Sequence, residues 1–306
     1  MSHQIKLFLK KLSTLILPII LVLLTIEFTL RQIPNSYKLK SYQLNTIAEN
    51  IKVIALGNSH TLYAINPKYM TFNTFNAANI SQSPDVDLAI LNTYKTQLKN
   101  LRTIVIRLSY DTLFEELKNS SEDWRLKDYK LYTDIKLDYN LKHNSELLSM
   151  GTKQCLKTLK THYIDGIPLS SCDSLGWGND IKTKPLVSLQ ESGMVAAKRH
   201  TASSWHLLDK NIYRFEKIML WGKLNGVDVY LITFPAYESY RNNLNEKQLY
   251  EMIKVGEFLA NKYPNCTYYN FINSKDFNAE DFYDSDHLNE RGAKKISLLV
   301  NSLIEN

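Results

Sequence analysis

Three residues near opposite ends of the sequence have the side chains of an acyl-transfer site. Ser59 follows Gly57 and Asn58, and Asp284 stands three residues before His287 in the segment FYDSDHLNERG. At this spacing a carboxylate can accept the Nδ1–H of the imidazole, which leaves Nε2 free to take a proton from a serine hydroxyl. We therefore predict Ser59 as nucleophile, His287 as general base and Asp284 as the group that orients the imidazole.

Each of these residues also has an interpretation without chemistry. A serine in a strand-to-helix turn is commonly an N-cap, and a histidine just before a helix commonly caps or packs. The acidic segment could also bind a metal ion through Asp284, Asp286, His287 and Glu290. Neither its spacing nor its glycine placement fits a calcium loop, so we predict no metal and no other cofactor. We interpret His60 as a helix-start residue that points away from the nucleophile.

Short apolar runs rich in β-branched residues alternate with helical patterns along the rest of the chain. Such alternation is typical of a doubly wound α/β domain with a mainly parallel sheet. Ser59 would then lie at the carboxyl end of the first strand, where open α/β sheets bind their ligands. The expected strands cover residues 51–56, 103–109, 227–234 and 266–271, and the expected helices cover residues 85–98, 207–225, 246–262 and 292–304.

This pattern is interrupted between about residues 110 and 206 by an aromatic-rich stretch that contains Trp124, Trp177 and Trp205. We interpret it as an insertion over the strand ends. Insertions at that edge commonly shape the substrate site of α/β proteins. The packing of a helical subdomain would account for the same aromatic residues, so both interpretations stay open.

The two motifs together resemble the SGNH, or GDSL-type, hydrolase superfamily. The first block reads VIALGNSH followed by LYAINP, and the last reads D-x-x-H-L-N-x-x-G. Their order along the chain also matches, so the resemblance frames residues 51–306. It implies a flavodoxin-like three-layer α/β/α fold and acyl-ester chemistry, with Ser59, His287 and Asp284 in the roles given above.

The chain departs from that family at the expected oxyanion hole. The family usually supplies a Gly after the second strand and an Asn after the third. Here the corresponding segments read FNAANISQSP and RLSYDTLF, without that Gly and that Asn. Asn79 is the nearest side-chain donor, and the Ser59 backbone N–H should contribute as well. Asn79 has a second interpretation as a residue that only supports the turn.

The N-terminal part of the chain contains an apolar segment at Leu12–Leu30. At about 1.5 Å per residue a helix of this length nearly matches a hydrocarbon layer roughly 30 Å thick. Lys6, Lys10 and Lys11 precede it, so the positive-inside rule places residues 1–11 in the cytoplasm. A cleaved signal peptide is the alternative, but no small-x-small site follows the apolar run.

We therefore expect a transmembrane anchor at residues 12–30, a polar connector at 31–50 and an SGNH-like domain at 51–306. That domain would face the periplasmic or other extracytoplasmic side of the inner membrane. A hydrophobic content of 44% is ample for a packed core, and the net charge of +6 is spread along the chain, which does not favour nucleic acid binding. A disulfide between Cys155 and Cys172 and a set of unpaired thiols are both open.

These features resemble bacterial cell-envelope members of the superfamily, which move or remove acyl groups on polysaccharides. The expected function is a membrane-anchored esterase or O-acyltransferase whose partners are an acylated glycan or acyl donor and a polysaccharide-modification machinery. Two alternatives stay open. One is an assembly or binding protein that has kept the fold without turnover, and the other is a lipid esterase at the bilayer surface.

Overall fold

The computed structural model describes residues 3–181 and 188–305, and its centre is one parallel sheet. The sheet has five strands in the order β2-β1-β3-β4-β5, and every neighbouring pair is parallel. This order and direction are those of the flavodoxin-like fold, so the predicted fold class is confirmed. The strands are β1 (Val53–Leu56), β2 (Thr74–Asn76), β3 (Thr103–Arg107), β4 (Asp228–Thr233) and β5 (Cys266–Asn270).

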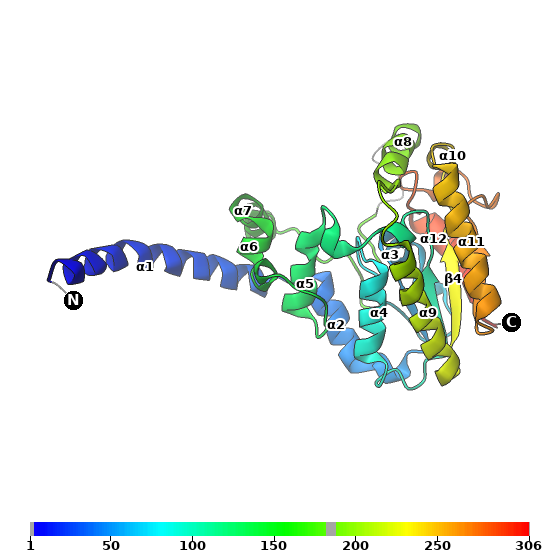
Figure 1. Ribbon diagram of the computed structural model, residues 1–306, viewed down its shortest axis with the longest axis horizontal. Helices are drawn as coiled ribbons and strands as arrows, with labels where there is room; N and C mark the ends of the chain where they lie inside the picture. Colours follow the sequence, from blue (N-terminus) through cyan, green and yellow to red (C-terminus); the bar gives the residue numbers. More distant parts are fainter. Residues whose placement is uncertain (1–2, 182–187, 306) are drawn as a thin grey trace.

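Helices cover both faces of the sheet, because the strands bury alternate side chains on opposite sides (Figure 1). Ile54 and Leu56 of β1 belong to the larger core, together with residues of α2, α4, α9 and α11. Val53 and Ala55 belong to the smaller core, which α12 covers. The helices that flank the sheet are α2 (Ser36–Ile47), α3 (Ser59–Ala64), α4 (Pro84–Tyr94), α9 (Leu208–Asn225), α11 (Glu246–Lys262) and α12 (Glu290–Glu305).

The insertion between β3 and α9 is mostly helical. Its α-helices are α5 (Leu126–Tyr132), α6 (Glu146–Met150), α7 (Thr152–Leu159) and α8 (Leu189–His200), and a further short helix, α10 (Glu238–Arg241), follows β4. The chain continues from α7 into one π-helical turn at Lys160–Ile164. Cys155, Cys172 and Cys266 are free thiols, so the disulfide considered from the sequence is wrong.

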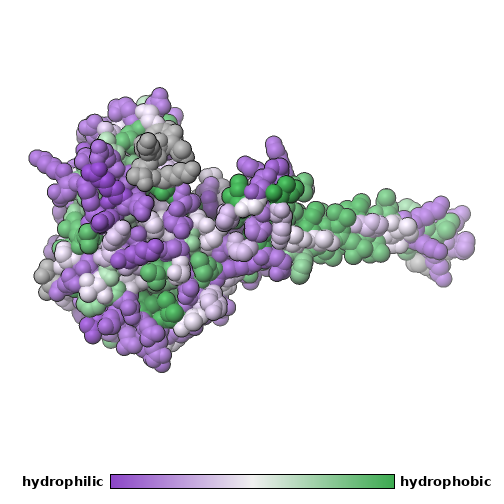
Figure 2. Space-filling model, turned by 180° about the vertical axis from the view of Figure 1, so that it is seen from behind, coloured by the Kyte–Doolittle hydropathy of each residue, from purple (hydrophilic) through white to green (hydrophobic). Residues whose placement is uncertain are grey.

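The first helix, α1 (His3–Gln32), projects from the domain (Figure 1). It is long and apolar enough to cross a membrane, and none of its most apolar stretch is buried against the rest of the protein. Figure 2 shows this helix as a hydrophobic rod attached to a largely hydrophilic body. The segment after it is not a polar connector. It forms α2, which is stabilised by the packing of Tyr37 and Leu44 in the larger core.

Candidate active site

Ser59 is the first residue of α3, at the carboxyl end of β1. Gly57 permits the tight turn between them: it has a φ of +126°, and a Cβ there would lie 2.5 Å from Thr61 Oγ1 and 2.9 Å from Arg107 Cβ. Asn58 caps the helix by accepting a hydrogen bond of 2.9 Å from the backbone N–H of His60. Asn58, and not Ser59, is therefore the N-cap, which leaves the serine hydroxyl available.

A second motif brings His287 to this serine from the other end of the chain. His287 lies in the loop before α12, and an isolated antiparallel bridge between Phe282 and Leu288 closes that loop. Ser297 of α12 accepts from the N–H of Asn66 at 2.9 Å and donates to the carbonyl of Ala64 at 3.0 Å. These two bonds hold α12 against the end of α3.

The three predicted residues lie within hydrogen-bond distance of one another. The Ser59 Oγ atom is 2.8 Å from His287 Nε2, and His287 Nδ1 is 2.9 and 3.1 Å from the two carboxylate oxygens of Asp284. Asp284 Oδ1 also accepts from the backbone N–H groups of Asp286 and His287. Because a carboxylate only accepts, Nδ1 carries the imidazole proton and Nε2 faces the serine as an acceptor. The arrangement can activate a hydroxyl for attack on an ester.

Asp286 is a second carboxylate at the site, and its position was not foreseen. It is 2% exposed, and its Oδ2 lies 3.3 Å from His60 Nε2 and 3.7 Å from His287 Nδ1. Asp284 holds the shorter contact to His287. Asp286 instead faces several nitrogens at once, since Arg199 and His200 of α8 each come within 3.9 Å of it. The insertion thus places part of α8 beside the histidine loop.

His60 does not point away from the catalytic set, which corrects the prediction for this residue. Its ring centroid is 4.8 Å from that of His287, because the short helix α3 turns the side chain back toward the 283–288 loop. Arg107 Nη1 lies 3.3 Å from His60 Nδ1, and an arginine can only donate. Nδ1 of His60 therefore accepts, and Nε2 carries the proton that it donates to Asp286. Burial lowers the pKa of His60 to about 4, so this ring is neutral near pH 7.

Arg107 is the buried cation that contacts His60. It is 1% exposed within β3 and forms ion pairs with Asp111 at 3.1 Å and Glu115 at 2.6 Å. A buried arginine paired on two sides is strongly fixed in position. The sequence did carry a signal for it, namely a charged residue inside the apolar run TIVIRLS.

Asn79, the candidate oxyanion donor, lies in the loop after β2. It is buried, and its Nδ2 donates to the Oε1 atom of Gln82 at 3.0 Å. The buried hydroxyl of Tyr129 is a second hydrogen-bonding neighbour of this amide. The role of Asn79 stays a prediction. The same loop contains Asn76, which the sequence did not single out: its Nδ2 donates to the carbonyls of Thr61, Leu62 and Ile65, all near the end of α3.

The distances at the site also bear on whether these residues could bind a metal ion. Among the described residues, ligand atoms of His60, Asp286 and His287 lie within 4.8 Å of one another, and Glu290 is not part of that group. Both nitrogens of each imidazole already have a hydrogen-bond partner. A metal ion would have to displace Ser59 or Asp284 from His287, so these residues fit a proton-transfer site better than a metal site.

Three solved structures are similar to this chain over most of its length. A protein from Bacteroides fragilis NCTC 9343, provisionally described as an acylhydrolase, has 11% identity and a TM-score of 0.44, with 87% of this chain and 93% of that chain covered. A protein from Streptococcus pneumoniae, provisionally described as a platelet activating factor, has 10% identity and a TM-score of 0.47, with 95% and 99% covered. A GDSL-like lipase from Bacteroides thetaiotaomicron VPI-5482 has 10% identity and a TM-score of 0.40, with 84% and 89% covered.

No protein-family model and no curated protein matches the chain. No residue role is transferred from the three solved structures, whose identities to this chain are 11% or lower. The roles of Ser59, His287 and Asp284 therefore rest on the two motifs and on the distances between their atoms.

The charge around His287 leads to a prediction about pH. Burial alone would lower the pKa of His287, but the carboxylates of Asp286 and Asp284 outweigh it and raise that pKa to about 9. Because a general base must be unprotonated, kcat/KM for an ester should rise with pH, with an inflection near pH 9 and an approximately tenfold fall per pH unit below it. Initial rates across pH 6–10.5 measure this directly. An inflection at the ordinary histidine value of about 6.5 would contradict it.

Proposed function

We propose that this protein is a membrane-anchored SGNH-type serine esterase or O-acyltransferase that acts on cell-envelope polysaccharide. The observation that carries the proposal is the continuous hydrogen-bonded line from Ser59 Oγ through His287 to Asp284. A serine that only capped α3 would not require an oriented imidazole at 2.8 Å, and Asn58 already fills the capping role.

The reaction proceeds through an acyl-Ser59 intermediate. His287 Nε2 takes the hydroxyl proton as Ser59 Oγ attacks the ester carbonyl, and the protonated imidazole then gives that proton to the departing alcohol as the C–O bond breaks. Water or a sugar hydroxyl attacks the acyl-enzyme in the same way and restores Ser59. The Ser59 backbone N–H, at the start of α3, and the side-chain amide of Asn79 would stabilise the oxyanion.

The first helix supports the proposed position of the protein. With α1 across the inner membrane and the lysines that precede its apolar segment in the cytoplasm, the α/β domain faces the extracytoplasmic side. Polysaccharide held at the same membrane would be within its reach. The proposed partners are an acylated glycan or acyl donor and the polysaccharide-modification machinery, with no nucleic acid.

A lipid esterase is the second candidate, and one cavity favours it. A cavity of about 300 Å³ is lined by Leu30 and Ile33 from the anchor's end of the chain, and by Leu62 and Asn79 from the surroundings of α3. The lining also includes the charged Lys127, Asp128 and Glu146, and the volume is at the lower end of small-molecule pockets. The two candidates share the acyl-Ser59 intermediate and differ in the donor.

Intact-mass measurement of the full chain in detergent tests the proposal. After incubation with p-nitrophenyl acetate, and separately with a short-chain phospholipid, an envelope enzyme should gain the mass of one acetyl group from the first and none from the second. The Ser59→Ala variant, treated in the same way, should gain nothing. An adduct from the phospholipid alone would favour the lipid esterase. A folded wild-type protein that gains no adduct from either ester would overturn both enzymatic functions.

A further inference from the structure

The anchor helix is joined to the domain through a fixed set of polar contacts. The carboxylate of Glu27 accepts from Ser145 Oγ at 2.8 Å and from the backbone N–H groups of Glu146 and Leu147 at 3.0 and 3.1 Å. It thereby caps the N-terminus of α6, which favours a negative charge. One turn later, Arg31 donates to the carbonyl of Asn144 at 2.6 Å. The last turns of α1 are therefore held against the start of α6.

Apolar side chains also hold α1 against the α6–α7 pair. Leu30, Ile33 and the wholly buried Cys155 of α7 form a separate small core, and the side chains of Leu147 and Leu159 pack around it. The anchor is thus packed against the α6–α7 pair, and its orientation relative to the domain is set by a built interface.

The rest of the α6–α7 segment carries large apolar side chains that have no cover. Ile164 is 77% exposed and Leu148 is 68% exposed. We define the α6–α7 face as Leu148, Leu156, Tyr163, Ile164 and Ile167, all of which are more than half exposed. Lys153 and Lys157 are exposed within the same segment. A cluster of this kind on a soluble surface usually marks a binding site for a protein or a membrane.

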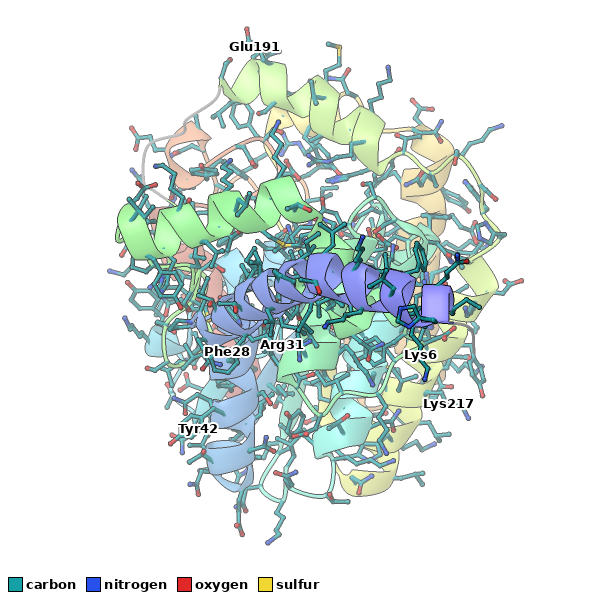
Figure 3. All side chains as sticks on the ribbon, turned by 90° about the vertical axis from the view of Figure 1, so that its left-hand side faces the viewer. Lys6, Phe28, Arg31, Tyr42, Glu191 and Lys217 are labelled. Carbon is teal, nitrogen blue, oxygen red and sulfur yellow. The ribbon has the colours of Figure 1, made fainter. Side chains whose placement is uncertain are left out.

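The position of this face relative to the anchor indicates what covers it. In Figure 1, α6 and α7 lie at the end of the domain from which α1 projects. Figure 3 looks from the anchor's side, and the bright green helix that contains α7 lies beside α1. Helix α7 packs against the last turns of α1 through Cys155 and Leu159, so it lies where α1 would leave the membrane that it crosses. Tyr163 also donates to the carbonyl of Thr29, so the face is continuous with the anchor.

We propose that the α6–α7 face is a second membrane-binding element, which lies in the headgroup region of the bilayer that α1 crosses. Its apolar side chains enter the boundary between headgroups and acyl chains, and Lys153 and Lys157 lie near anionic phosphates. The binding partner is lipid, because a bilayer that surrounds the apolar part of α1 would extend to the end of α1 that contacts α6 and α7. The proposal rests on the membrane-spanning role of α1 and is independent of the ester chemistry.

A fluorescent probe on the α6–α7 face tests the proposal. The full chain carrying Leu156→Cys is labelled with the environment-sensitive dye NBD and reconstituted in vesicles of phosphatidylcholine and phosphatidylglycerol. The three native thiols are buried, and the labelled wild-type chain measures any residual reaction with them. Leu224→Cys is the matched control, since Leu224 is 75% exposed at the end of α9, far from α1 in Figure 1.

With doxyl-labelled lipid in the vesicles, the emission at position 156 should fall by about half or more and should be protected from aqueous iodide. The emission at position 224 should be quenched by aqueous iodide and should change little with doxyl-labelled lipid. Equal iodide quenching at both positions, equal lipid quenching at both, or a chain that does not float with the vesicles would each overturn the proposal. Fluorophosphonate labelling of Ser59 in the same vesicles reports separately on the ester chemistry, so failure of one proposal is distinguishable from failure of the other.

Discussion

Replacing Ser59 with alanine should reduce kcat for ester hydrolysis by about 10⁴-fold or more, because the covalent route through the serine is lost. This corresponds to more than about 5 kcal/mol of transition-state stabilisation. The fold should be retained, since the capping bond from Asn58 and the bonds from Asn76 to the end of α3 do not use the serine side chain. Turnover of p-nitrophenyl acetate and covalent labelling by a fluorophosphonate measure the effect.

Ser203→Ala is the matched control for this experiment. Ser203 is an exposed serine in the loop between α8 and α9, and its loss should change neither turnover nor labelling. Unchanged labelling of the Ser59→Ala chain would mean that another residue is the nucleophile. If the biological phenotype of the wild type persists in Ser59→Ala, the assembly or binding function without turnover becomes the better description.

The second large effect is expected for Asp284→Asn. The asparagine oxygen can keep the two bonds from the backbone N–H groups of Asp286 and His287, which places the amide nitrogen next to His287 Nδ1. Nδ1 must then accept, so Nε2 carries the proton and cannot take one from Ser59. We expect kcat to fall by about 10³–10⁴-fold with little change in melting temperature.

Asp286→Asn is the comparison that separates the two carboxylates. Asp286 does not hold the short contact to His287, so its loss should reduce the maximal rate by less than about tenfold. It should, however, shift the inflection of the pH profile below pH 9, because one of the two charges that raise the pKa of His287 is removed. If Asp286→Asn lost more activity than Asp284→Asn at every pH, the assignment of the two carboxylates would be reversed.

The strands and main helices were predictable because each has a strong local pattern. The helix predicted at 246–262 is observed as Glu246–Lys262, and the strand predicted at 103–109 is observed as Thr103–Arg107. β2 is different: it has three residues and no apolar run, so only its pairing with β1 defines it. The segment at 31–50 has few apolar residues, so its local sequence does not predict a helix. The helix is stabilised by the packing of its side chains against the sheet.

The same distinction applies to the site. Asp284 and His287 are three residues apart, and both motifs follow recognisable turns, so their meeting with Ser59 could be inferred from the sequence. The partners of Asp286 come from two other parts of the chain, namely His60 in α3 and Arg199 and His200 in α8. Contacts between segments so distant along the chain depend on the tertiary fold, and one sequence alone carries no record of them.

Asn76 couples the two sides of the candidate oxyanion site. Its amide nitrogen binds carbonyls at the end of the serine's helix, and its amide oxygen accepts from the N–H of Ala78, next to Asn79. We therefore expect a displacement of α3 to be transmitted to the loop that carries Asn79. For an oxyanion donor at Asn79, this link would keep its spacing from Ser59 more constant than the position of either residue.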